Sequence, residues 1–249
     1  VTPGKMLYVS SNVGALQFAE MVGRENFYKY VKLFGYGQPT GIDIAAEDSG
    51  IVNWPIGENW SDLTLSQNGF GQSIAVTPIQ HLTAISAIAN GGTLMRPHVV
   101  KRLCKGAQCE DIAPETVRRV VDQGVTDQIR DMLVANSDGA YAPVVWGPLT
   151  GSYQPMPLVP GFRVTAKTGT SQIAVNGGWD NNGTIGSVVG WAPAENPRIS
   201  VLVKIDRPKD DPWGVNTAIP VYQKVVSQVL RYYRMPPNPD FMNPLQVGK

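Results

Sequence analysis

The last third of the chain changes to strand periodicity, and this change restricts the available folds more than any other feature of the sequence. Residues 162–166, 184–192 and 198–206 form three apolar-rich segments separated by turn-forming residues. In the last of them Ile and Val alternate with other residues, which is the period of a strand. The Asn- and Gly-rich residues 176–183 predict a loop between the first two segments, and the amphipathic residues 220–233 predict a final helix.

Helical spacing dominates the earlier part of the chain. Side chains able to cap a helix occur at residues 10–12, and an amphipathic stretch follows them. Thr77 and Pro78 suit the N-cap and the first position of another helix. Residues 37–73 and 139–161 are rich in Gly, Pro and polar turn formers, so they predict irregular loops.

Helices followed by an antiparallel meander and a last helix predict an α+β fold around one sheet. The 249 residues are 43% hydrophobic and 16% charged, which is typical of a globular domain. We expect one domain, residues 1–249, with a mainly helical part with loops (1–161), a part with the strands and C-terminal helix (162–235) and a tail (236–249).

Charge and hydropathy argue against several functions. The formal charge is +1 and no run of like charges occurs, so the sequence predicts no nucleic-acid partner. No apolar run reaches the length of a membrane span. The first residues do not form a signal peptide, which leaves a mature, a cytosolic or a shortened chain.

The two cysteines, Cys104 and Cys109, flank a short segment that contains Gly106. This spacing favours a disulfide that closes a small loop, as suits an oxidising compartment. Half of a metal site and two free thiols are the alternatives. No second cysteine pair exists and neither His81 nor His98 stands at ligand spacing, so we expect no metal and no cofactor.

Two short motifs carry the chemistry. The usual phosphate-binding, dinucleotide-binding and zinc-protease signatures are absent, and two histidines do not favour a Ser-His-Asp triad. Residues 167–170 read Lys-Thr-Gly-Thr, and residues 10–12 read Ser-Ser-Asn, a Ser-x-Asn element. Each alone is weak, because the first can be a plain strand end and the second a helix cap. Their order along the chain makes the pair more informative.

Several other stretches strengthen the same interpretation: residues 35–43, 71–80, 89–92, 189–193 and 218–222. With Ser-x-Asn and Lys-Thr-Gly, they make the chain resemble class B penicillin-binding proteins, which are serine D,D-transpeptidases that cross-link bacterial cell wall. The resemblance runs nearly end to end and is weakest in the middle. It implies part of the penicillin-binding-protein/serine β-lactamase-like transpeptidase fold, an antiparallel sheet flanked by helices plus a helical subdomain.

The resemblance implies that three residues are catalytic. Ser10 would pass a proton between the leaving amine and a catalytic lysine, and Asn12 would hold the substrate carbonyl and that lysine together. Lys167 would bond Ser10 and attract the terminal carboxylate of the substrate.

The next three residues are implied to bind substrate. Thr168 and Thr170 offer hydroxyls to the carboxylate, and Gly169 lets the substrate lie along the strand as an added edge strand. The backbone N–H of Thr170 would form half of an oxyanion hole.

One element of the family is missing from this sequence. The family's Ser-x-x-Lys precedes Ser-x-Asn and carries the acylated serine, but no Ser-x-x-Lys occurs here. We expect the nucleophile on an upstream segment of the same protein, which would be a partner of this chain, and we expect the chain alone to be inactive. A natural pseudo-enzyme is the alternative.

The resemblance also implies the surroundings of the protein. Its partners would be peptidoglycan stem peptides, β-lactam antibiotics and other cell-wall synthesis proteins. It would be extracytoplasmic and anchored by an N-terminal segment that this chain lacks. Two other functions stay open: a β-lactamase or D,D-carboxypeptidase of the same fold, and a non-catalytic scaffold or β-lactam sensor.

Overall fold

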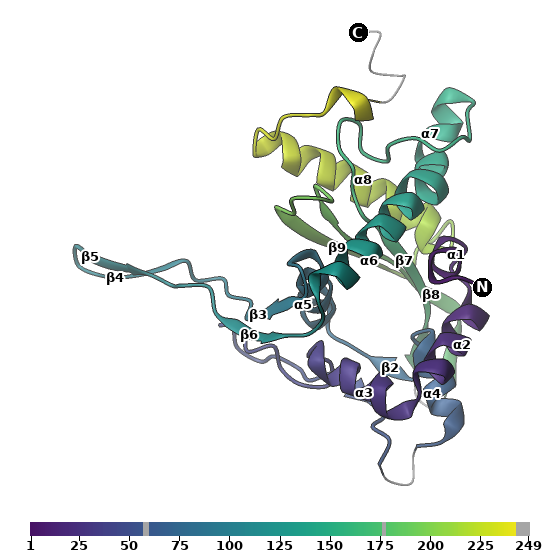
Figure 1. Cartoon of the computed structure of the whole chain (residues 1–249), viewed down its shortest axis with the longest axis horizontal. Coiled ribbons are helices and arrows are strands. Elements are labelled where there is room, and N and C mark those ends of the chain that lie inside the picture. Colours follow the sequence, from purple (N-terminus) through teal and green to yellow (C-terminus); the bar gives the residue numbers. More distant parts are fainter. Residues whose placement is uncertain (57–59, 176–177, 243–249) are drawn as a thin grey trace. The chain divides into compact units, whose positions relative to one another are not determined.

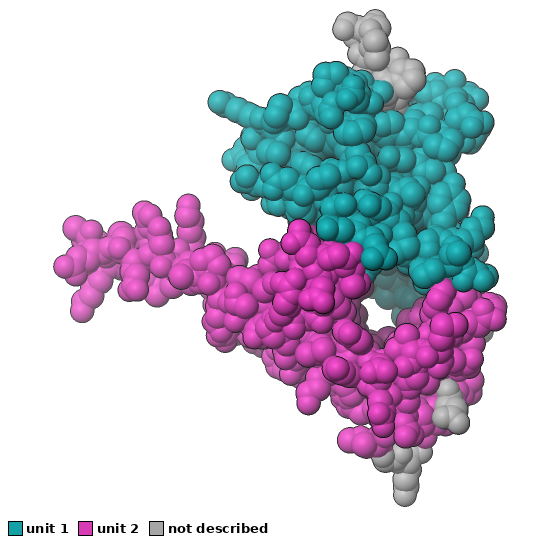
Figure 2. Space-filling view, viewed as in Figure 1, with its two compact units in different colours: residues 1–11, 127–249 teal, residues 12–126 magenta. Residues whose placement is uncertain are grey.

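The structure, a computed structural model, describes the following residues: 1–56, 60–175 and 178–242. The chain forms two compact units, coloured separately in Figure 2. Unit 1 contains Val1–Ser11 and Asp127–Lys249, and unit 2 contains Asn12–Thr126. The sequence-based division at residue 161 followed secondary structure, whereas unit 1 packs residues from both ends of the chain together.

Unit 1 is built on a three-stranded antiparallel sheet in the order β7-β8-β9 within the described residues. The strands are β7 (Lys167–Val175), β8 (Gly178–Ala192) and β9 (Ile199–Asp206). Lys167 lies opposite Val189 on β8, and β7 is an edge strand. The predicted antiparallel meander is therefore confirmed.

Helix α8 (Gly214–Tyr232) packs against this sheet, as predicted. Its fully buried side chains are Ala218 and, at spacings of three and four residues, Ile219, Tyr222, Val226 and Leu230. Burying a side chain of Leu or Ile size contributes about 1.5–3 kcal/mol. The helix begins before the predicted residue 220, because the Asp211 carboxylate accepts hydrogen bonds from the Trp213 N–H (2.7 Å) and the Asn216 amide (2.8 Å) in its first turn. A 3-10 helix, η2 (Pro239–Phe241), follows.

The first strand begins later than the sequence predicts. Residues 162–166 were expected in the strand, with Lys-Thr-Gly at its end, but β7 starts at Lys167. The reason lies at Thr165, whose hydroxyl accepts the Trp191 N–H at 2.9 Å while its carbonyl accepts the Tyr222 hydroxyl at 2.7 Å. The carbonyl is thus diverted from the ladder, and Gly190 makes room because a Cβ there would overlap it.

Two predicted loops, 139–161 and 176–183, are wrong in part; residues 151–161 are irregular as predicted, and residues 176–177 lie outside the described residues. Residues 178–183 form the first part of β8, because β7 and β8 continue to pair beyond a register shift at Gln172 and Ile173. Residues 139–150 belong to a helical run that comprises α6 (Gln123–Asn136), the π-helix η1 (Ser137–Tyr141) and α7 (Ala142–Thr150). Composition suggested a loop, but Pro143 stands in the first turn of α7, where proline is tolerated.

Unit 2 consists of helices and three short antiparallel strand pairs among its described residues. The helices are α2 (Asn12–Val22), α3 (Arg24–Leu33), α4 (Asp62–Gly69) and α5 (Pro78–Ala89). The pairs are β1 (Ile51–Val52) with β2 (Ile74–Ala75), β3 (Thr93–Met95) with β6 (Thr116–Arg119), and β4 (Arg102–Lys105) with β5 (Gln108–Asp111).

The cap of α5 is confirmed. Thr77 accepts the Gln80 N–H, and the Gln80 side chain accepts the Thr77 N–H in return, with Pro78 in the first turn. Helix α4, in contrast, occupies part of the predicted loop 37–73. Its capping box between Ser61 and Thr64 is a start signal that the loop interpretation overlooked.

The β4–β5 hairpin projects from the rest of unit 2 (Figure 1). A disulfide joins Cys104 and Cys109, which lie directly opposite each other with a Cα–Cα distance of 4.1 Å. Arg102 and Asp111 form an ion pair at the base of the hairpin. Residues 101–111 are all exposed, so the hairpin holds itself together without adding to a core.

Candidate active site

Ser10 lies just beyond the C-terminal end of α1 (Pro3–Tyr8) rather than at the start of a helix. Its N–H donates to the Leu7 carbonyl (3.2 Å), and the Ser11 N–H donates to the Met6 carbonyl (3.0 Å). These two bonds form a Schellman motif, and Ser10 takes the left-handed position with φ +50°. Ser10 thus ends α1 through its backbone N–H, and the helix predicted to follow residues 10–12 begins at Asn12.

Helix α1 is placed by close contacts with the α6–η1 run. Gly4 lies next to Met132, where an added Cβ would come within 3.4 Å of the side chain. Gly139 lies under the Tyr8 ring, which a Cβ on Gly139 would approach to 2.8 Å. These contacts fix the helix end that carries Ser10.

The structure brings Ser10 and Lys167 together. The ammonium of Lys167 donates to the Ser10 Oγ at 2.8 Å and to the Thr168 carbonyl at 2.8 Å. An ammonium has three donors, so its third N–H can meet a ligand. Because the Ser10 oxygen accepts from Lys167, its own proton can be donated elsewhere.

The edge of β7 presents a row of binding groups. The N–H and the carbonyl of Thr168 point away from β8, since they bond to Tyr141 and Lys167. Alternation along a strand turns the backbone of Thr170 to the same edge. The Thr170 hydroxyl accepts the Gly214 N–H of α8 at 3.0 Å, which leaves its proton for a ligand.

The substrate-binding residues predicted from the sequence are accessible. Thr168 is half-buried, and Gly169 and Thr170 are exposed on the edge strand. An extended peptide can therefore pair with this edge.

Asn12, the third predicted catalytic residue, is described with the other unit. It is the exposed first residue of α2 and belongs to unit 2. Its predicted role as a carbonyl and lysine ligand remains a prediction.

Two residues that the sequence did not suggest lie beside Lys-Thr-Gly. The Tyr141 hydroxyl contacts the Thr168 N–H (3.1 Å) and the Thr168 Oγ1 (3.0 Å). The Asn136 amide donates to Tyr141 at 2.9 Å and to the Ala166 carbonyl at 3.2 Å. No sequence signal marked them, because Tyr141 falls in a segment whose composition predicts a loop.

One carboxyl group near this cluster is perturbed. Burial raises the pKa of Asp138 in η1 to about 6, against the lowering effects of the Leu158 N–H and the Arg163 charge.

The described chain offers neither a ligand set for a metal ion nor a membrane-spanning helix. Among the described residues, no group of three or more His, Cys, Asp or Glu side chains could hold a metal ion. No helix in the described part of the chain could span a membrane.

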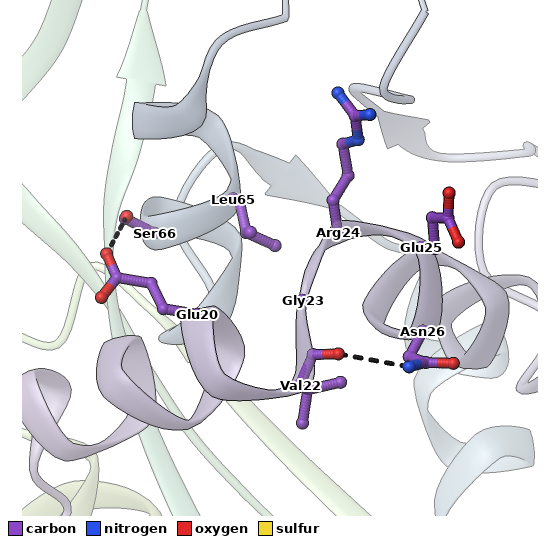
Figure 3. Close-up of a pocket in the computed structure, with 8 residues that line it drawn as sticks. All are labelled: Glu20, Val22, Gly23, Arg24, Glu25, Asn26, Leu65 and Ser66. Carbon is purple, nitrogen blue, oxygen red and sulfur yellow. Dashed lines mark hydrogen bonds between the residues drawn. The ribbon is translucent and has the colours of Figure 1, made fainter.

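Unit 2 contains an open hollow between α2, α3 and α4 (Figure 3). Glu20, which bonds Ser66 at 3.1 Å, and Arg24 line it, and the guanidinium of Arg24 stacks on Trp60 at 5.2 Å. None of the residues predicted to act on substrate lines this hollow. We therefore place the candidate active site at Ser10 and β7 in unit 1.

The three-stranded sheet, α8 and the Lys–Ser contact fit the transpeptidase fold that the sequence resemblance implies. Residues 1–229 match the family described as "Penicillin binding protein transpeptidase domain". The chain belongs to this family.

Two curated relatives and one solved structure are similar to it. Stage V sporulation protein D of Bacillus subtilis is 33% identical over 228 residues, covering 89% of this chain and 33% of that protein. PbpB of Mycobacterium tuberculosis is 31% identical over 246 residues, covering 95% of this chain and 34% of that protein. The crystal structure of penicillin-binding protein 3 from M. tuberculosis with aztreonam has a TM-score of 0.80 and 28% identity, covering 97% of this chain and 53% of that chain. The chain thus spans about a third of the length of these two relatives, which are class B penicillin-binding proteins.

Proposed function

We propose that the protein containing this chain is a peptidoglycan D,D-transpeptidase that works by serine acyl transfer. The observation that carries the proposal is the 2.8 Å contact between the Lys167 Nζ, at the start of an edge strand, and the Ser10 Oγ. The family match supports the same activity.

The proposed reaction has two steps. A serine of a Ser-x-x-Lys element, which this sequence lacks, attacks the carbonyl of a D-Ala-D-Ala terminus and gives its hydroxyl proton to the lysine of that element. The bond to the terminal D-alanine breaks, and Ser10 passes a proton to the leaving nitrogen. An amine of a second stem peptide then attacks the acyl-enzyme, returns a proton and releases the serine.

In this proposal β7 binds the substrate. The stem peptide pairs with the strand edge, and its terminal carboxylate meets the third N–H of Lys167 and the hydroxyls of Thr168 and Thr170. The Thr170 N–H stabilises the oxyanion, a donor typically worth about 3–4 kcal/mol.

The surroundings are also part of the proposal. The complex of the M. tuberculosis relative with aztreonam supports β-lactams as ligands that mimic the D-Ala-D-Ala terminus. We place the protein outside the cytoplasm on an N-terminal anchor, with other cell-wall synthesis proteins as partners. This chain alone is proposed to be inactive, because its sequence holds no Ser-x-x-Lys.

The test uses the protein encoded by the longest reading frame that contains this sequence, called here the reading-frame protein. It is incubated with a fluorescent penicillin, and intact mass reports acylation. Lys167→Ala should slow acylation by about 100- to 1,000-fold, because it removes a charge aimed at the site. Lys224→Ala, an exposed lysine on α8, is the matched control and should label at the wild-type rate.

The outcomes separate the alternatives. Rapid release of hydrolysed drug would indicate a β-lactamase. Release of D-alanine from a donor peptide without transfer to an acceptor amine would indicate a carboxypeptidase. Wild-type protein that is never acylated would leave a scaffold or pseudo-enzyme, and the proposal would be wrong.

A further inference from the structure

The phenol of Tyr141 is the centre of a polar cluster to which the proposed reaction assigns no role. Three groups surround its oxygen: the Thr168 N–H at 3.1 Å, the Thr168 Oγ1 at 3.0 Å and the Asn136 Nδ2 at 2.9 Å. Tyr141 is 4% exposed and Asn136 is fully buried. A buried phenol needs hydrogen-bond partners. The Tyr141 hydroxyl can donate one hydrogen bond and accept two, so these three contacts use its full capacity.

The orientation of the Asn136 amide is fixed by its second contact. The Ala166 carbonyl, 3.2 Å from the Asn136 Nδ2, can only accept a hydrogen bond. The amide nitrogen must therefore face Ala166, and its other hydrogen points to Tyr141. The Asn136 Oδ1 is then a buried oxygen without a hydrogen-bond partner. Burying it costs free energy, and the two hydrogen bonds that the Asn136 amide nitrogen donates offset that cost.

These contacts determine where the Tyr141 proton goes. The phenolic oxygen accepts from the Thr168 N–H and from Asn136, which uses both of its lone pairs. The contact with the Thr168 Oγ1 must therefore be a bond donated by Tyr141. Because that oxygen accepts from Tyr141, the Thr168 hydroxyl proton is directed away from the core.

We infer that Tyr141 is a positioning residue that orients the Thr168 hydroxyl as a donor to the substrate carboxylate. This inference rests on the proposed function and adds a specificity-determining group to it. The bonds run in one direction, from Asn136 to Tyr141, to Thr168 and on to the ligand, and such chains strengthen each member.

The local backbone supports this role. Tyr141 ends a π-helix, a rare element that interrupts an α-helical run and often occurs at functional sites. The Ala142 N–H donates to the Ser137 carbonyl, five residues back. The extra residue in this turn changes the direction of the side chains that follow, and Tyr141 bonds to β7 from this position.

The experiment compares benzylpenicillin with its methyl ester, which lacks the carboxylate. Acylation rate constants of the reading-frame protein are measured for both, and their ratio reports recognition of the carboxylate. In Tyr141→Phe the ratio should fall by about three- to tenfold, the equivalent of one neutral hydrogen bond. The ester rate should stay within about twofold of the wild-type value.

Matched variants separate positioning from packing. Tyr222→Phe removes another buried hydroxyl of the same core, which donates to the Thr165 carbonyl, and should leave the acid-to-ester ratio unchanged. Thr168→Val should lower the ratio, and adding Tyr141→Phe to it should cause no further fall. Thr168→Ser keeps a hydroxyl and should restore sensitivity to Tyr141→Phe.

Three results would overturn the inference. They are unchanged rates for both compounds in Tyr141→Phe, an equal loss for acid and ester that leaves the ratio unchanged, and an additive loss in the Thr168→Val background. Wild-type protein that no penicillin acylates would instead refute the proposed function, and the inference with it.

Discussion

Ser10 occupies a backbone conformation in which glycine is the residue usually found. It is the left-handed position of a Schellman motif, and a side chain there costs roughly 1–2 kcal/mol. The Cβ of Ser10 causes this strain, and the hydroxyl that it carries lies 2.8 Å from the Lys167 Nζ. Glycine at this position would relieve the strain, so the presence of serine instead indicates that its side chain has a function.

Replacing Ser10 tests whether strain and function share one residue. Ser10→Gly should be more stable than Ser10→Ala by about 0.5–1 kcal/mol, since glycine accepts a positive φ but loses more chain entropy on folding. Both variants should lose penicillin acylation, because both lack the hydroxyl. Denaturant unfolding and labelling of the reading-frame protein measure the two effects.

The control for Ser10 is Ala46, an exposed residue with φ +61°. Ala46→Gly should gain similar stability and leave acylation unchanged. Full labelling of Ser10→Gly would show that the hydroxyl is not needed.

Short motifs predicted Ser10 and Lys167 correctly as neighbours, but not Tyr141 and Asn136. A motif reports residues whose spacing along the chain is informative. Tyr141 reaches Thr168 across 27 residues, and Asn136 reaches Ala166 across 30. Only the folded α6–η1 run creates these contacts, so the sequence alone could not indicate them.

At the scale of elements, the strands and α8 were predictable because their apolar periods are regular. The boundaries were not, since side-chain contacts set them. The Thr165 hydroxyl ends the ladder before Lys167, and Asp211 lets α8 begin before Pro220. The helical run over residues 139–150 was missed because packing overrides the turn-like composition of that segment.

Gly139 in η1 provides a prediction at this scale. In Gly139→Ala the new Cβ would meet the Tyr8 ring at 2.8 Å, so the ring must shift, and we expect the end of α1 to follow it and carry Ser10 away from Lys167. Acylation should fall by about tenfold while stability changes little, because helix propensity gains up to about 1 kcal/mol. Stopped-flow acylation and thermal unfolding check the two parts.

Two variants sharpen this test. Gly124→Ala, in α6 with no atom near its added Cβ, should gain stability with normal acylation. Tyr8→Ala removes the obstructing ring and should restore activity to Gly139→Ala. Failure of that rescue would mean that Gly139 acts by another route.

At the scale of the whole molecule, the antiparallel sheet with its C-terminal helix was predicted, and the two compact units were not. The first eleven residues and the C-terminal half form unit 1, a grouping that no local pattern encodes. The β4–β5 hairpin was likewise missed, apart from the favoured cysteine pairing. Its residues are all exposed, so they lack the alternating apolar pattern that would have predicted a strand.

The pH dependence of unfolding should reveal Asp138 as a destabilising charge in unit 1. Its folded-state pKa of about 6 lies above the ordinary value of 3.8, so the folded state binds a proton more tightly than the unfolded state. The resulting stabilisation is complete below about pH 4 and is lost as the pH rises through about 6. Two charged side chains face this carboxyl: Arg163 lowers the pKa of Asp138 and Glu195 raises it. They form an ion pair with each other, and burial is the largest cause of the raised pKa.

Asp138→Asn isolates this effect, because the amide oxygen can still accept the Leu158 N–H, which lies at 3.2 Å in the native protein. The variant should melt above the wild type at pH 7.5, where the buried carboxylate is charged, and the difference should shrink as the pH falls to 5. Scanning calorimetry of both proteins across this range measures it. A difference that stays constant with pH would mean that the Asp138 carboxyl titrates in the folded protein as it does in water.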